Sequence, residues 1–183
     1  GVNAGTIAVT VDGIAVSTVT KTAIDGGYKC TCTSPTLKDG SHTISVKASD
    51  NDGNAAAAKT ATFTVDTVPP TLQITAPSND LITNKKTVTV SGKTDDVSSK
   101  PVTVTVNGAT VTVGTDGTFT KDVTLAEGAN TITIVAKDKA GKTTTVTRKV
   151  TVDTSAPVIK SVTLTPNPVD CGKTFIIVVE ITD

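Results

Sequence analysis

The sequence predicts an all-β protein made of small β-sandwich modules in tandem, and three observations support this. Val and Thr are frequent, while aromatic residues are scarce, with three Phe, one Tyr and no Trp among 183 residues. β-branched side chains suit a pleated, half-buried sheet, and thin sandwiches suit cores of Val, Ile, Leu and Ala. Apolar and polar residues alternate along most segments, and the alternating pattern repeats after about 90 residues.

The repeat sets the predicted domain boundaries. VDTVPP at 65–70 recurs as VDTSAP at 152–157, which is 87 residues later. TLKDGSHTISVKASDNDGN at 36–54 recurs as TLAEGANTITIVAKDKAGK at 124–142, which is 88 residues later. A period of about 90 residues is the size of an immunoglobulin-like sandwich.

The first module is predicted over 1–66 and is expected to be incomplete. VTVDG at 9–13 matches VTVNG at 104–108 in the next repeat, so the segment corresponds to strands C to G of a sandwich. Strands A and B are therefore expected to be missing from this module.

The three cysteines are predicted to be reduced thiols. Cys30 and Cys32 lie two apart in an alternating segment, on the same strand face as Tyr28. We expect this face to be buried, with the two thiols acting as small hydrophobic side chains. A disulfide between next-but-one residues of an extended strand is geometrically poor. Cys171 has no evident partner.

A complete module is predicted over 67–154. Each of its strands alternates at period 2 and is bounded by turn residues such as Asn-Gly and Asp-Gly. The expected strands are 71–77, 87–92, 101–107, 109–113, 117–125, 129–138 and 145–153.

The last segment, 155–183, is predicted to hold strands A and B of a further module, at 158–166 and 173–183. Three arrangements of the two ends are open. This stretch is part of a longer chain of modules, or the hairpin of one copy completes the first module of the next copy, or the half-module folds by itself. The second arrangement gives head-to-tail strand addition and a fibre.

These residues carry a family resemblance. The VDTxxP linkers, VTVDG, DGSHTISVKASDNDGN and EGANTITIVAKDKAGK resemble the tandem bacterial immunoglobulin-like domains of surface proteins and adhesins, which are also found in phage virion proteins. The resemblance implies a linear array of sandwiches, and it leaves the function open because such domains serve as spacers, stalks and adhesive tips.

Several function classes are disfavoured. Seventeen basic and seventeen acidic residues give a net charge of zero, and no basic stripe is interleaved with aromatics, so nucleic acid is not an expected partner. No apolar run reaches the roughly 20 residues needed to insert into a membrane. His42, the single histidine, is predicted to be structural, and no triad, zinc motif or phosphate loop accompanies it, so we expect no enzyme.

Calcium is the one cofactor that the sequence supports. Loops B–C and F–G of a sandwich lie at the pole where the chain enters, which predicts an inter-module calcium site from Asp66, Asp95, Asp96 and Asp138. A second candidate is the DNDGN segment, which alternates oxygen ligands around a Gly. Turn formation by the same Asp and Asn residues is the alternative explanation for both. The second set of candidate ligands is Asp50, Asp52 and Asn54.

Three functions follow as hypotheses. The first is a stalk or fibre-forming, adhesive segment of an extracellular bacterial surface protein or filament, with neighbouring modules of the same or an identical chain as partners and a host-surface glycan or protein as a further one. The second is a decoration or tail-fibre component of a phage virion that contacts the host surface weakly. The third, a carbohydrate-binding accessory module, is disfavoured because sugar platforms need exposed aromatic rings.

Overall fold

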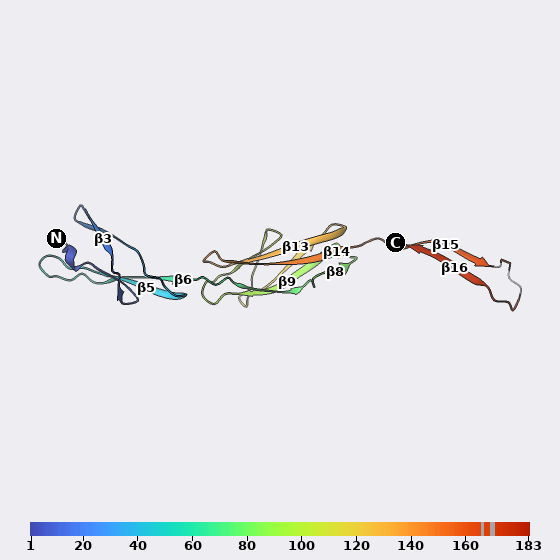
Figure 1. Cartoon of the computed structure of the whole chain (residues 1–183), viewed down its shortest axis with the longest axis horizontal. Helices are drawn as coiled ribbons and strands as arrows, with labels where there is room; N and C mark the ends of the chain where they lie inside the picture. Colours follow the sequence, from blue (N-terminus) through green and yellow to red (C-terminus); the bar gives the residue numbers. More distant parts are fainter. Residues whose placement is uncertain (166, 169–170) are drawn as a thin grey trace.

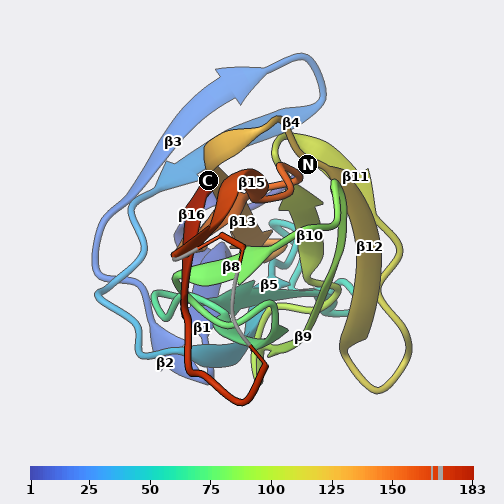
Figure 2. The ribbon, with the colours of Figure 1, turned by 90° about the vertical axis from the view of Figure 1, so that its right-hand side faces the viewer.

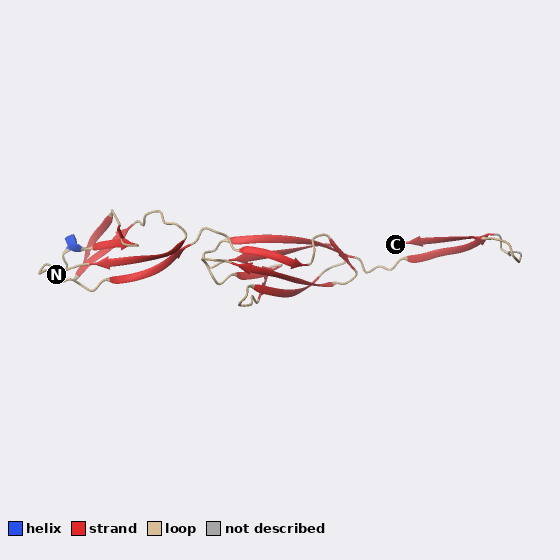
Figure 3. Cartoon of the chain, turned by 90° about the horizontal axis from the view of Figure 1, so that it is seen from below, coloured by secondary structure: helices blue, strands red, loops and turns tan. Residues whose placement is uncertain are grey.

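The computed structural model describes residues 1–165, 167–168 and 171–183, and it confirms that the chain is all-β. The described residues form sixteen strands and one short 3-10 helix. Three groups of strands follow one another along the long axis, so the linear arrangement is also confirmed (Figures 1 and 3). We name them module one (1–66), module two (67–154) and the C-terminal hairpin (155–183).

Module two is a two-layer sandwich. One sheet has the strand order β11-β10-β13-β14-β8 and the other has the order β12-β9-β7. Inward residues of both sheets form one core of mostly Val and Ile, with Phe119 among them. The strands are β7 (Thr71–Ala76), β8 (Leu81–Thr83), β9 (Thr87–Asp95), β10 (Thr103–Val106), β11 (Ala109–Val111), β12 (Thr118–Thr124), β13 (Gly128–Lys137) and β14 (Thr143–Val152).

Seven of these strands lie where the alternation predicts them, whereas β8 was not predicted. It is three residues long and pairs in parallel with β14, with Val150 opposite Leu81 and Val152 opposite Thr83. The other strand pairs of module two are antiparallel. The parallel pair places an edge strand next to the last strand of the module.

Module one is more open. Its main sheet has the order β2-β1-β5-β6, and β3 and β4 form a separate hairpin that projects away from it (Figure 2). Val9 and Val11 are its buried aliphatic residues among those that the structure describes. The elements are η1 (Ala4–Thr6), β1 (Ala8–Val11), β2 (Ile14–Ala15), β3 (Val19–Ile24), β4 (Gly27–Cys32), β5 (Gly40–Lys47) and β6 (Lys59–Val65).

The predicted burial of the cysteine face was wrong. Cys30 and Cys32 in β4 are free, as expected, but both are exposed, and Tyr28 is 37 % exposed. The corresponding strand of module two, β12, is paired with β9, whereas β4 pairs with β3 alone. Tyr28 and Cys30 line an open pocket together with Val46 of the main sheet, so the face borders that sheet without being buried by it. Cys171 is also free and exposed.

The C-terminal hairpin consists of β15 (Val158–Thr165) and β16 (Ile176–Thr182), paired antiparallel. The predicted strand 158–166 ends at Pro166, which lies outside the described residues. Both faces of β16 are exposed and apolar, including Ile176, Ile177, Val178 and Val179. An uncovered apolar strand of this kind is a site for association with another strand or sheet.

Candidate metal centre at the junction between modules

The linker between modules one and two is held on both sides. Thr67 donates from its backbone N–H and its hydroxyl to the Asp39 carboxylate of module one, at 3.1 and 2.8 Å. Pro70 is fully buried, and its carbonyl accepts from the Thr144 hydroxyl of module two. Asp66 begins this linker directly after β6, and its Oδ1 accepts from the Val68 N–H at 3.1 Å.

Asp96 follows β9 at the entry pole of module two. Its Oδ1 accepts from the backbone N–H groups of Ser98 and Ser99, at 2.9 and 2.7 Å. These two bonds are the Asx-type contacts that Asp makes in turns. The Ser98 hydroxyl donates to Asp66 Oδ1 at 3.2 Å, which ties this loop to the linker.

Asp138 lies in the loop between β13 and β14, next to the loop of Asp96. Its Oδ1 accepts from the Lys142 N–H at 2.8 Å, and its backbone N–H donates to the Lys142 carbonyl. The Ser99 hydroxyl accepts from the Ala140 N–H at 2.8 Å, so the two loops are joined.

The three aspartates converge on one point. One carboxylate oxygen from each lies within 4.8 Å of the others. Asp66, Asp96 and Asp138 are 8, 5 and 4 % exposed. Asp66 Oδ2 and Asp138 Oδ2 are buried and accept no hydrogen bond from any described residue. Oxygen atoms placed in this way can hold a hard divalent cation.

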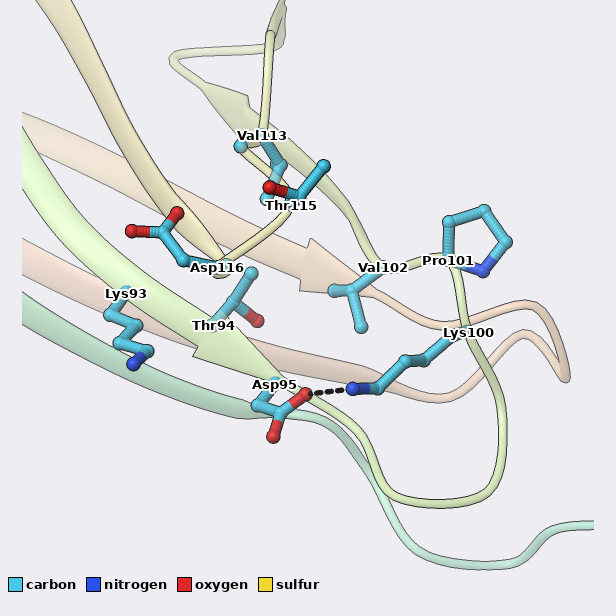
Figure 4. Close-up of a pocket in the computed structure, with 11 residues that line it drawn as sticks. Lys93, Thr94, Asp95, Lys100, Pro101, Val102, Val113, Thr115 and Asp116 are labelled. Carbon is cyan, nitrogen blue, oxygen red and sulfur yellow. Dashed lines mark ion pairs between the residues drawn. The ribbon is translucent and has the colours of Figure 1, made fainter.

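Asp95, the fourth predicted ligand, is not part of this convergence. Its Oδ1 lies 2.8 Å from the Lys100 ammonium, and the pair borders a pocket of about 400 Å³ on module two (Figure 4). The Lys100 hydrogen bond lowers the pKa of the Asp95 carboxyl. Its charge is therefore already compensated, and no buried unpartnered oxygen borders this pocket among the described residues.

The DNDGN loop of module one forms a turn of its own. Asp50 Oδ1 accepts from the N–H groups of Asp52 and Asn54, at 3.0 and 2.8 Å, and Oδ2 accepts from the Asn54 amide at 2.8 Å. These contacts, led by the Asn54 side chain, lower the pKa of Asp50. Both Asp50 oxygens have local partners, as the turn explanation expects.

His42 has a local partner as well. Its Nδ1 lies 2.6 Å from Asp12 Oδ2 and its Nε2 lies 2.8 Å from the Lys38 carbonyl. Asn130, at the equivalent position of module two, bonds to Ala126 four residues earlier in the same way. The position closes the corner that precedes a strand in both modules.

The sequence analysis missed the linker clamps. Glu127 holds Thr154 through its N–H and hydroxyl, at 2.8 and 2.7 Å, as Asp39 holds Thr67. The sequence did contain a signal for these clamps. Asp39 in KDG and Glu127 in AEG are equivalent positions of the repeat, 88 residues apart. No helix among the described residues is long and apolar enough to span a membrane.

Comparisons with known proteins agree with this architecture. Residues 1–67 match the family described as bacterial Ig-like domain, and residues 70–154 match glucodextranase domain B. The chain is 32 % identical over 140 residues to bacillopeptidase F of Bacillus subtilis (strain 168), which covers 76 % of this chain and 9 % of the length of that protein.

Two solved structures are among those to which the chain is similar. The fibronectin(III)-like modules of Clostridium thermocellum CbhA share 18 % identity, with 84 % of this chain and 82 % of that chain covered and a TM-score of 0.44. A tetra-tandem repeat from the extending region of a large adhesion protein shares 22 % identity, with 95 % and 54 % covered and a TM-score of 0.41. The family matches therefore follow the two modules: module one matches a bacterial Ig-like domain, and module two matches glucodextranase domain B.

Proposed function

We propose that this chain is a non-catalytic spacer segment of an extracellular bacterial surface protein or filament. The observation that supports this best is the pair of linker clamps, Thr67 to Asp39 and Thr154 to Glu127. A carboxylate that accepts two hydrogen bonds from one threonine fixes both the backbone and the side chain at the start of the linker. The clamps limit rotation between neighbouring modules, as a spacer requires.

The linker composition supports the same proposal. Pro69 and Pro70 restrict the backbone, and Pro-rich linkers behave as semi-rigid spacers. Module two fastens the far end through the Thr144 hydroxyl, which donates to the Pro70 carbonyl, and it holds the beginning of the linker through Ser98, which donates to Asp66. A linker that is held along its length keeps successive modules in line rather than letting them collapse together.

A non-catalytic role is consistent with the side-chain chemistry. The single imidazole is engaged by Asp12 and by the backbone of Lys38. The thiols that the structure describes lie on the exposed hairpin β3–β4 and within the C-terminal hairpin, and all of them are free. Since this chain spans 9 % of bacillopeptidase F, the peptidase activity in that name is not assigned to it.

The open apolar faces suggest the partners. In module two, β7 and β9 pair antiparallel and cover one side of the core. The β15–β16 hairpin has the same antiparallel pairing, and its apolar residues are uncovered. We propose that strands of a neighbouring immunoglobulin-like module cover this hairpin, and that module one is completed in the same way.

A reach experiment tests the spacer. The chain is placed between a cell-wall anchor and a ligand-binding tip, and a Gly/Ser segment of equal length is the control. A flexible segment of this length has an end-to-end distance of only about 70–80 Å. We expect this chain to present the tip to bead-coupled ligand more efficiently. Equal presentation by the Gly/Ser control, or direct binding of the purified chain to host glycan, contradicts the spacer proposal.

A further inference from the structure

The junction gathers three buried carboxyl groups that take part in no ion pair among the described residues. In the part of the chain that the structure describes, no Lys, Arg or His nitrogen lies within 4.0 Å of a carboxylate oxygen of Asp66, Asp96 or Asp138. Buried charges are normally paired or coordinate a metal, because each one loses its hydration. We propose that these three aspartates bind one calcium ion, which joins the linker to the two entry loops of module two.

The unpartnered oxygens carry this inference. At each aspartate, Oδ1 is occupied by N–H groups of its own loop. Asp66 Oδ2 and Asp138 Oδ2 are left buried without a donor. Turn formation accounts for Oδ1 of each residue and leaves Oδ2 of Asp66 and of Asp138 without a partner. A cation at the point of convergence gives the second oxygens a partner.

The geometry fits calcium. Calcium binds oxygen at about 2.3–2.6 Å, so two oxygens on the same ion lie at most about 5 Å apart. The three carboxylate oxygens lie within 4.8 Å of one another. A cavity of about 390 Å³ lies beside Asp66, and Ser98, Ser99, Lys100 and Lys139 also line it. The donor set is entirely oxygen, with no His or Cys, which disfavours zinc.

The repeat provides internal comparisons. Asp153 occupies the position of Asp66 in the second linker, and its Oδ1 accepts from the Ser155 N–H in the same turn, yet Asp153 is exposed. Asp50 occupies the position of Asp138, and both of its oxygens have partners. The turn sequences alone therefore do not produce a buried, unpartnered oxygen. It arises where the linker meets the two loops.

The test uses the whole chain, stripped with chelator and titrated with CaCl2 by calorimetry and thermal melting. We expect one strong site, and a rise of about 10–20 °C in the melting temperature of module two when free calcium is 100 times its Kd. Magnesium at the same concentration should shift melting much less, since it demands closer octahedral geometry and dehydrates reluctantly.

Asn variants locate the site, because the Asn carbonyl still accepts the bonds of Oδ1. Asp66→Asn, Asp96→Asn and Asp138→Asn should each weaken calcium binding at least tenfold, with Asp153→Asn and Asp50→Asn unchanged within about twofold. In chelator, Asp138→Asn should melt at or above the wild-type temperature, because one uncompensated charge is gone. In the presence of calcium, the wild type should melt at the higher temperature of the two.

Two results overturn the inference: no calcium-dependent heat or melting shift in the wild type, or equal loss of binding in the Asp153→Asn and Asp50→Asn controls. That calcium also stiffens the spacer rests on the proposed function, and it is measured separately by the angle between modules. Binding without a change in that angle removes the stiffening role and leaves the calcium site in place.

Discussion

Truncation of the Ile134 side chain should lower the stability of module two and leave that of module one unchanged. Ile134 in β13 is fully buried, and its register partners are Val106 and Val146. Ile→Ala removes three carbons, worth about 2.4 kcal/mol at about 0.8 kcal/mol each. The cavity left in a thin core adds to this, which gives about 3–4 kcal/mol in total. For a domain of this size, the melting temperature should fall by about 12–30 °C.

Calorimetry of the whole chain separates the transitions of the modules. The control is Ile82→Ala in β8, where the side chain is 74 % exposed and the expected cost is below about 0.5 kcal/mol. The reasoning is refuted if Ile134→Ala lowers the melting temperature by less than about 4 °C. It is also refuted if the transition of module one moves equally, since the modules would then unfold as one unit.

Four further predictions concern module one and the hairpin. The Asp12 hydrogen bond raises the pKa of His42 above 6.5. The stability that protonated His42 gives to module one is therefore complete below about pH 6.5 and is lost as pH rises through the raised pKa. In melting measured against pH, His42→Asn should remove this alkaline decline. The same hydrogen bond lowers the pKa of Asp12 below 3.8. The stability that ionised Asp12 gives to module one is therefore lost only as pH falls through that lowered pKa. Asp12→Asn should remove this loss of stability in acid. All three thiols should react rapidly with a thiol reagent in the native protein, and slow labelling would contradict their exposure. Ile177→Lys with Val179→Lys on one face of β16 should reduce concentration-dependent association in ultracentrifugation, and unchanged association would show that this face is not the contact.

Alternation at period 2 was enough to predict most strands, because it depends on local side-chain direction. It could not predict β8, since three residues are too few to show a period and the partner strand lies about 70 residues away. It also showed that Tyr28 and Cys30 share a face, but not that the face is uncovered. Burial depends on a second layer, and alternation carries no information about that layer.

The candidate site was predictable to a similar extent. Linker and loop aspartates were expected at one pole of module two, and the structure brings Asp66, Asp96 and Asp138 together there. Asp95 and Asp96 are neighbours at the end of a strand, where successive side chains point to opposite sides. The alternation of β9, in which Val88 and Val90 face the core, puts Asp96 on the inward side, and the sequence analysis did not extend this pattern to the end of the strand. Asp95 instead faces Lys100, a partner that becomes visible only once the loop between them is folded.

The parallel pairing of β8 with β14 has a mechanical consequence. β14 leads directly into the second linker, so tension on the chain acts along this strand. β14 forms three register pairs with β8 on one side and ten with β13 on the other. Tension along β14 acts on all of these pairs in the direction of the strands. Sliding β14 out therefore requires many hydrogen bonds to break together, whereas a strand pulled from its end separates one bond at a time. Module two is built to resist stretching more strongly than its thin aliphatic core suggests.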